Sequence, residues 1–252
     1  MGGTGDRPGQ KLMRGLLAAI GFLTRLPVPP KVFDDASGSS SSLPWYPAVG
    51  LLIGGLLWLS SWIMASLPPL LAAAALLLIW AGLTGALHLD GLADSADAWV
   101  GGLGDRERTL AIMKDPRSGP MGVTALVLVL LLKFAALASL PPHGAALWLA
   151  PLLGRAALTA AFMLMPYVRS GGLGSALAGA PRGASVAALC VTGLIAACAG
   201  WHGLRALAVS LAVFACWRLA CMRRLGGMTG DTCGALTELT EAAVLFALAL
   251  DA

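Results

Sequence analysis

The sequence has 252 residues, of which 58% are hydrophobic and only 12% are charged, and its mean hydropathy is +0.80. This balance excludes an ordinary soluble globule, because so few polar side chains could not cover a core of this size. The net charge of +4 does not indicate nucleic-acid binding either, since the cations lie beside apolar runs without a basic stripe interleaved with aromatic residues. We therefore expect an integral membrane protein.

The N-terminal segment from Lys11 to Leu23 is the first apolar stretch, and it is too short to span a bilayer. Its basic start is typical of a signal peptide. However, Arg25 and a proline cluster stand where a small-residue cleavage site would be expected. We expect this segment to be retained as an interfacial or re-entrant helix.

Seven longer apolar stretches follow, each about long enough to cross a membrane as a helix. They cover residues 48–67, 70–87, 121–140, 145–165, 184–200, 203–221 and 235–250. The last is the weakest because it opens with Glu238 and Glu241, whose side chains we expect to face protein or water. Since one span cannot bury its own sides, we predict an all-α polytopic transmembrane bundle of about seven spans. We expect it to form a single domain over residues 1–252.

The connections between these stretches alternate between two kinds, and the alternation predicts an orientation. On one side they are minimal turns such as Pro68-Pro69. On the other side they are longer, at residues 88–120, 166–183 and 222–240, and with the N-terminal arm they hold most of the 17 Lys and Arg residues. By the positive-inside rule, the face with the long connections is cytoplasmic.

Three aspartates open the first long connection at helical spacing. Asp90, Asp94 and Asp97 stand at i, i+4 and i+7, so a helix places their carboxylates on one face. Like charges at this spacing repel, and poor solvation at a membrane boundary adds to the cost. A divalent cation would relieve both penalties, and oxygen-only ligands suit Mg²⁺ or Mn²⁺. His88 lies beside them as either a site residue or a helix-end hydrogen-bond partner.

A second acidic group lies in the glycine-rich segment at residues 226–234. Its glycines let backbone amides approach an anion closely, while Asp231 is placed to cap the next helix or to coordinate a metal. Glu238 follows seven residues later, and we expect it near the same face as the aspartates of the first connection. The segment therefore predicts a phosphate or metal–phosphate cradle.

Several cations stand close to these acids in the sequence. Lys114 and Arg117 lie in a loop constrained by Pro and Gly, where they could clamp a diphosphate. Arg169 begins a second cationic, glycine-rich loop suited to anions. Arg155 lies in the middle of a span, so it forms either a structural ion pair or a substrate contact. A metal with convergent Arg and Lys side chains is typical of phosphoryl transfer.

Taken together, these residues resemble the cobalamin synthase family, also called the adenosylcobinamide-GDP ribazoletransferases. The resemblance runs nearly end to end. It is carried by Phe22-Leu-Thr-Arg25-Leu-Pro27, Tyr46-Pro-Ala-Val-Gly50, His88-Leu-Asp90-Gly91-Leu-Ala-Asp94 with Asp97, the loop from Lys114 to Gly122, Gly154-Arg155 and Gly230-Asp231-Thr-Cys-Gly234 with Glu238.

The resemblance implies a bacterial inner-membrane enzyme that joins the phosphocobinamide part of adenosylcobinamide-GDP to α-ribazole or its 5′-phosphate. GMP leaves, and Mg²⁺ is required. The expected Mg²⁺ ligands are Asp90, Asp94, Asp97 and Asp231. The expected catalytic residues are these four with Lys114 and Arg117, and the expected substrate contacts are Arg25, His88, Arg155, Arg169 and Glu238. Whether Asp97 or Glu238 serves instead as the base stays open.

Two other classes compete with this interpretation. A CDP-alcohol phosphotransferase also uses aspartates at a membrane surface, but its motif fails here because Asp94 follows Ala93. An ion-coupled transporter would place its site near the midplane, whereas these acids gather at one face. As further partners we expect membrane lipid, a second copy of the chain and other proteins of cobalamin synthesis, and no nucleic acid.

Overall fold

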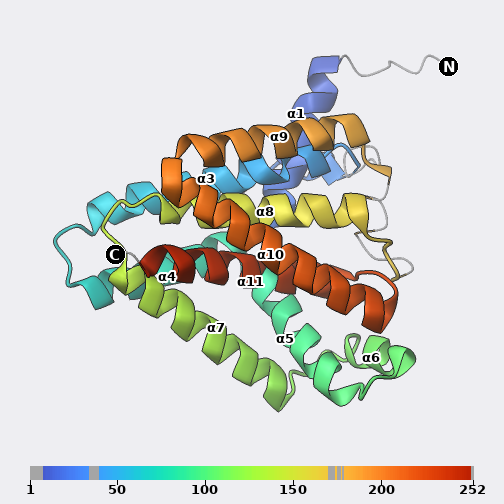
Figure 1. The fold of residues 1–252 in the computed structure, drawn as a ribbon. Coiled ribbons are helices and arrows are strands. Elements are labelled where there is room, and N and C mark those ends of the chain that lie inside the picture. The colour runs from blue at the N-terminus through green and yellow to red at the C-terminus, as the bar shows by residue number, and fades with distance from the viewer. Residues whose placement is uncertain (1–7, 34–39, 170–173, 175–176, 178, 251–252) are drawn as a thin grey trace.

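The structure is a computed structural model that describes residues 8–33, 40–169, 174, 177 and 179–250. The regular elements of this part are all helical, and one isolated β-bridge pairs Tyr167 with Met228. The elements in chain order are α1 (Pro8–Leu23), η1 (Pro30–Phe33), η2 (Leu43–Trp45), α3 (Tyr46–Ile63), α4 (Pro69–Thr84), α5 (Leu87–Gly101), α6 (Arg106–Ile112), α7 (Pro120–Ser139), α8 (Ala146–Leu164), α9 (Arg182–Cys198), α10 (Gly200–Leu225) and α11 (Gly230–Ala249) (Figure 1).

The expected all-α polytopic bundle is confirmed, with a lower count of candidate spans. In the described part, five helices are long and apolar enough to cross a membrane: Leu43–Ile63, which includes α3, and α7, α8, α10 and α11. The expected spans at 70–87 and 184–200 form α4 and α9, with 16 and 17 residues. At 1.5 Å per residue, α9 is about 25 Å long, less than the roughly 30 Å of a hydrocarbon core. A sixth span results if α4 and α5 count as one.

A sharp bend separates α4 from α5. The two helices meet at 89°, because Gly85 and Ala86 both adopt left-handed backbone conformations, with φ of 61° and 57°. Arg25 lies against this bend: its backbone N–H donates to the Leu83 carbonyl at 2.7 Å, and its side chain covers the space beside Gly85 that a Cβ would need. The three aspartates therefore stand on a separate helix and do not continue the direction of the second apolar stretch.

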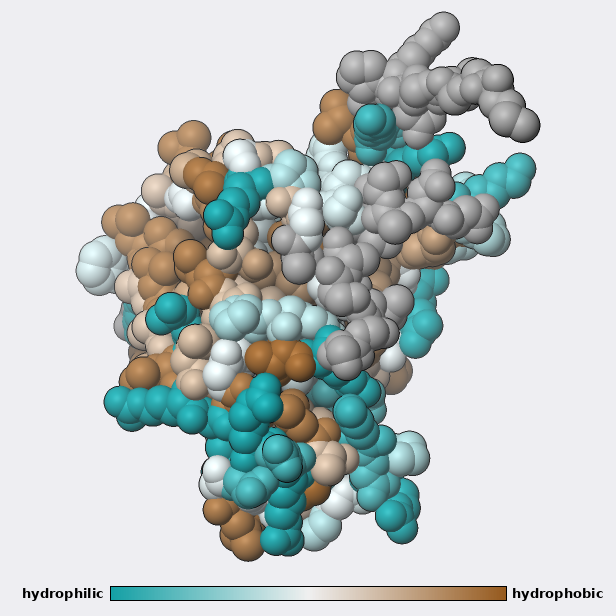
Figure 2. Space-filling view, turned by 90° about the vertical axis from the view of Figure 1, so that its right-hand side faces the viewer, coloured by the Kyte–Doolittle hydropathy of each residue, from teal (hydrophilic) through white to brown (hydrophobic). Residues whose placement is uncertain are grey.

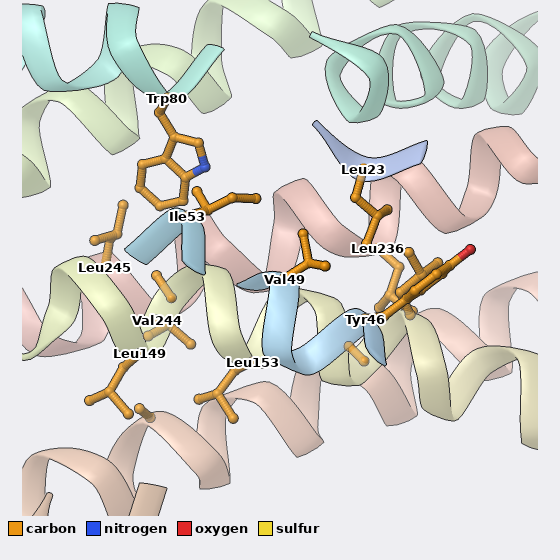
Figure 3. Close-up of a cluster of buried hydrophobic side chains, with 14 of the residues drawn as sticks. Leu23, Tyr46, Val49, Ile53, Trp80, Leu149, Leu153, Leu236, Val244 and Leu245 are labelled. Carbon is orange, nitrogen blue, oxygen red and sulfur yellow. The ribbon is translucent and has the colours of Figure 1, made fainter. Parts of the chain in front are cut away.

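The centre of the bundle is formed by α8 and α11. About three quarters of each apolar window lies buried, 72% in α8 and 78% in α11. Figure 3 shows Leu149 of α8 near Val244 of α11, and Leu153 of α8 near Val49 of α3, within one buried cluster. Helix α3 packs closely on α8 because Gly50 faces the backbone of Pro151, where a Cβ would collide. These central helices form the support for the polar side chains at one end.

The short helix α1 lies at the edge of the bundle, and its first residues project beyond it (Figure 1). It has 16 residues and leaves Leu12 and Met13 more than half exposed. This matches the expectation of an N-terminal helix too short to span.

One end of the molecule is polar. Figure 2 views the side on which α6 and the end of α10 lie in Figure 1, and hydrophilic side chains gather over the lower half of this face. The face belongs to the long connections of the chain, as the charge distribution predicts.

Candidate active site

A cavity of about 600 Å³ lies where α5, α8 and α11 meet the segments before α7 and after α8. Its polar side chains come from residues that the sequence predicts as site residues: His88, Asp90, Lys114, Arg169 and Asp231. Its large apolar side chains are Phe22, Leu87, Leu158, Phe162 and Tyr167. The cavity thus combines a charged side with an aromatic and aliphatic side.

The two acidic motifs meet because α5 and α11 cross at glycines. A Cβ on Gly91 would lie 2.7 Å from the carbonyl oxygen of Asp231, and a Cβ on Gly234 would lie 3.0 Å from that of His88. Any larger residue at either position would push the helices apart. The glycines of the Asp-Gly-Leu-Ala-Asp and Gly-Asp-x-x-Gly segments therefore bring Asp90 and Asp231 to one cavity.

Asp94 stands one helical turn after Asp90 and is half-buried. Its carboxylate interacts unfavourably with the charges of Asp90, Asp231 and Asp97, and favourably with that of Arg169. The like charges outnumber the single opposing cation, so this group of acids favours the binding of additional positive charge.

Arg169 is a cation that forms an ion pair with one of these acids. Its Nη1 donates to Asp231 Oδ2 at 3.1 Å, in a partly exposed ion pair. The segment before it is fixed to the start of α11 by two backbone hydrogen bonds, from Val168 N–H to Met228 O and from Met228 N–H to Pro166 O, each 2.9 Å long. Residues 170–173 of the predicted glycine loop fall outside the described residues, whereas Gly174 lines the cavity.

Asp97 has a different set of partners from the other aspartates. Its Oδ2 accepts a hydrogen bond from Gly119 N–H at 2.7 Å, and its Oδ1 accepts one from Gly122 N–H at 2.8 Å. Gly119 is the N-cap of α7, so the carboxylate satisfies amides that a helix start leaves unpaired. Asp97 thereby positions the loop that carries Lys114, and it does not line the cavity.

The two cations of this loop are placed differently. Lys114 lines the cavity, although it is largely exposed. Arg117 is not among the lining residues: its side chain is 87% exposed and forms two hydrogen bonds to Asp115, each 3.0 Å long. These bonds lower the pKa of Asp115. Arg25 likewise lies outside the lining, at the bend between α4 and α5.

A second set of charges lies buried beneath the cavity. Lys133 of α7 donates to Glu238 at 2.8 Å and to Glu241 at 2.6 Å, and Arg155 of α8 pairs with Glu241. All four side chains are at most 5% exposed. For Arg155 the structure shows the ion pair that the sequence left as one of two alternatives. Glu238, expected at the substrate, does not line the cavity, and Lys133 and Glu241 were not predicted as partners.

The carboxylate oxygens of the cavity suit a hard cation such as Mg²⁺, but protein side chains alone do not complete its coordination shell. In the described part, no group of three His, Cys, Asp or Glu side chains is placed to hold a metal ion. Asp90 and Asp231 nevertheless share the cavity and offer carboxylate oxygens. Mg²⁺ commonly takes one or two carboxylates and fills its other positions with water and substrate phosphates. The two aspartates fit that pattern, and the four-aspartate ligand set stays a prediction.

The aromatic side of the cavity was not predicted from the sequence. Phe162 and Tyr167 stack with ring centroids 6.1 Å apart and an interplanar angle of 19°, and Phe22 stacks on Tyr46 at 6.2 Å and 16°. Phe22 stood within a segment that carried the family resemblance, but nothing in its spacing indicated a cavity wall. Only the tertiary packing brings these rings into the same cavity as the carboxylates.

Comparison with known proteins identifies the relatives of this chain. A family model described as cobalamin-5-phosphate synthase matches residues 15–249. The adenosylcobinamide-GDP ribazoletransferase of Ectopseudomonas mendocina (strain ymp) is 54% identical over 242 residues, which cover 92% of this chain and 97% of the relative. The enzyme of the same name from Pseudomonas aeruginosa is 54% identical over 244 residues, with 96% and 100% covered. No solved structure matches the chain.

Proposed function

Because the chain belongs to the cobalamin-5-phosphate synthase family, we propose that it transfers phosphocobinamide from adenosylcobinamide-GDP to α-ribazole or its 5′-phosphate. A hydroxyl oxygen of the ribazole loses its proton and forms a bond to the phosphorus that carries the cobinamide. The bond from that phosphorus to the bridging oxygen breaks, and GMP leaves with this oxygen and the electron pair, while the hydroxyl proton passes to GMP or to solvent. The family match does not favour a CDP-alcohol phosphotransferase or an ion-coupled transporter.

The observation that carries the proposal is the meeting of both charge signs in one cavity. Asp90 and Asp231 line it together with Lys114 and Arg169. Cations beside a diphosphate stabilise the charge that develops on the transferred and departing groups, which is the main contribution a protein makes to phosphoryl transfer. Lys114 and Arg169 therefore orient the diphosphate and offset its charge.

The carboxylates of Asp90 and Asp231 are the groups that would hold Mg²⁺, with Asp94 next to them. When bound, the ion would neutralise phosphate oxygens and relieve the repulsion among these acids. Arg169 pairs with Asp231 at 3.1 Å. An incoming diphosphate offers that guanidinium a stronger anionic partner, which leaves Asp231 available to a cation. Asp97 contributes by holding the start of α7 and the loop with Lys114.

The size of the cavity supports an assignment for the parts of the substrates. A volume of about 600 Å³ is suited to a small molecule but not to a whole corrin with its attached groups. The aromatic side, with Phe22, Phe162 and Tyr167, has flat apolar surfaces and is suited to the benzimidazole of α-ribazole. The corrin is then placed outside the cavity, on the polar face, which we propose lies toward the cytoplasm of a bacterial inner membrane.

A direct test is GMP release by the purified chain in nanodiscs, given adenosylcobinamide-GDP and α-ribazole 5′-phosphate. We expect release only when both substrates and Mg²⁺ are present, and loss of release when the metal is chelated. Release of GMP without the ribazole would indicate hydrolysis and contradict the transfer. Turnover that persists in the presence of a chelator would contradict the Mg²⁺ assignment alone.

A further inference from the structure

A second cavity, of about 210 Å³, lies at the end of the bundle opposite the polar face. It is enclosed by the turns that join α3 to α4 and α7 to α8, and both turns lie on the far side of the molecule from α6 (Figure 1). In the described part, no Asp, Glu, Lys or Arg side chain lines this cavity, and its walls are apolar apart from Ser61 and His143. The cavity therefore has an apolar body and one polar position.

His143 stands where a turn normally has glycine. Gly144 N–H donates to Pro141 O at 3.1 Å, which closes a four-residue turn with Pro142 and His143 at its centre. The φ of His143 is 60°, a left-handed conformation that disfavours a side chain, although Gly144 is the next residue. Backbone strain of this kind concentrates at ligand-binding positions, which indicates a role for the imidazole.

Three contacts hold His143 in this conformation. Its ring stacks on that of Trp62, with centroids 3.8 Å apart and an interplanar angle of 5°. Its backbone carbonyl accepts from Trp58 Nε1 at 3.1 Å, and its Nδ1 lies 2.7 Å from Ser61 Oγ. The imidazole is thus fixed on one face and at one nitrogen.

The hydroxyl of Ser61 determines which ring nitrogen is free to accept. Ser61 Oγ donates its single proton to Trp58 O at 2.6 Å, because a carbonyl can only accept. Ser61 must then accept from His143, so the proton of the neutral imidazole is on Nδ1 and Nε2 has a lone pair. In the described part, Nε2 has no hydrogen-bond partner and is not closed off from solvent. His143 therefore presents an accessible acceptor nitrogen.

The level of this acceptor in a bilayer determines which ligands reach it. Helices α7 and α8 and the segment Leu43–Ile63 are long enough to cross a membrane, so the turns at their ends lie near the lipid headgroups. Trp58 and Trp62 lie beside His143 and are 39% and 53% exposed, which is typical of aromatic side chains at this interface. An apolar cavity at this level fits a lipid acyl chain, with the polar position beside the headgroup.

We infer that this cavity binds a phospholipid with a primary ammonium headgroup, such as phosphatidylethanolamine. The ammonium donates a hydrogen bond to His143 Nε2 beside the indoles of Trp58 and Trp62, whose faces attract cations, and an acyl chain fills the apolar body. A net anionic headgroup meets no cation at this cavity, and a choline headgroup has no N–H to donate. The site does not depend on the proposed function, because it lies at the opposite end of the bundle from Asp90 and Asp231.

The headgroup is tested with lipids that have identical acyl chains and differ in N-methylation. The full chain in detergent micelles is given equal amounts of phosphatidylethanolamine, its N,N-dimethyl form, phosphatidylcholine and phosphatidylglycerol, and retained lipid is counted by native mass spectrometry. We expect the first two to be retained at least about tenfold over phosphatidylcholine, because the dimethylammonium keeps one N–H and choline has none. Equal retention of all four, or a preference for phosphatidylglycerol, would overturn the inference.

The acceptor is tested by substituting His143. His143→Phe keeps an aromatic ring for the stack on Trp62 but removes Nε2, so the preference for phosphatidylethanolamine over phosphatidylcholine should disappear. His202→Phe, in the first turn of α10 and outside the cavity, is the matched control and should keep that preference. A preference that persists in His143→Phe would contradict the hydrogen bond.

The acyl-chain part of the site is tested by a pair of variants on α4. Ala72→Phe fills the cavity, whereas Ala74→Phe adds the same ring to an exposed position outside it. Only the first should lower the retention of phosphatidylethanolamine, by about tenfold or more, since burial of a few methylene groups is lost. Equal retention in the two variants would show that the lipid does not enter the cavity.

Nitrogen NMR gives a readout in the unsubstituted chain. The protein has only 3 histidines, and with ¹⁵N-histidine the signals of His143 are those lost in His143→Phe. In phosphatidylcholine nanodiscs we expect a protonated Nδ1 and an unprotonated Nε2, and a shift of the Nε2 signal when phosphatidylethanolamine is added but not when phosphatidylglycerol is added. The opposite tautomer, or no shift with phosphatidylethanolamine, would overturn the inference.

Discussion

The bundle contains two charged clusters that differ in balance and in access to solvent. The cavity cluster has three acids, Asp90, Asp94 and Asp231, and two cations, Lys114 and Arg169. Its members are exposed or half-buried. The buried cluster consists of Lys133, Arg155, Glu238 and Glu241. It has as many cations as anions, and each charge has a partner inside the protein.

The difference distinguishes a binding site from a structural network. Charges that are buried and fully paired have no free positions for a ligand, and they restrict the helices to one arrangement. Charges that are unbalanced, half-exposed and gathered around a cavity still need a partner from outside. The contact of His88 with Arg155 joins the two clusters. Substitutions in the cavity cluster should therefore lower turnover, whereas substitutions in the buried cluster should lower stability.

The largest expected effect on turnover is that of Asp90→Asn. It keeps the shape of the side chain and removes a charge from the cavity, so kcat/KM for GMP release should fall about 10³-fold, or about 4 kcal/mol. The temperature of unfolding should not fall, because repulsion among the acids is reduced. Glu107→Gln, on the exposed surface of α6, is the matched control and should leave both unchanged. A large loss of stability in Asp90→Asn would contradict the interpretation of the cavity cluster as a binding site that does not stabilise the fold.

Lys133→Met should have its main effect on stability. It leaves Glu238 and Glu241 buried with one cation between them, and breaking such a pair costs about 3 kcal/mol or more. Unfolding in detergent micelles, followed by circular dichroism against denaturant, measures the change. The double variant with Glu238→Gln should recover part of it, because the remaining charges balance again. A single variant as stable as the unchanged chain would show that the buried cluster is not structural.

The smallest expected effects are those on KM of substituting the two cations in the loop before α7. Lys114→Ala should raise KM for adenosylcobinamide-GDP by about tenfold or more, because the ammonium lines the cavity. Arg117→Ala should change it by less than about threefold, since the guanidinium is exposed and pairs with Asp115. Steady-state GMP release with saturating ribazole phosphate measures both. A stronger effect of Arg117 would support the catalytic role predicted from the sequence and indicate that the loop closes on the substrate.

Part of the site could be predicted because it depends on local spacing. Asp90, Asp94 and Asp97 share a helix face by periodicity alone. The lengths of the apolar stretches predict the helices that support them. Five predicted residues, His88, Asp90, Lys114, Arg169 and Asp231, do come to one cavity. The roles of the four predicted metal ligands are still predictions.

The sequence by itself determined that this is an all-α membrane bundle of one family, with a polar end rich in carboxylates. Only the tertiary structure decided which charges meet. Gly91 and Gly234 set the α5–α11 crossing, Asp97 binds the start of α7, and Glu241 takes Arg155. The physical reason is that helix periodicity and hydropathy act over neighbouring residues. Contacts between residues more than 20 positions apart depend on how the helices pack, and that packing could not be predicted from a single sequence.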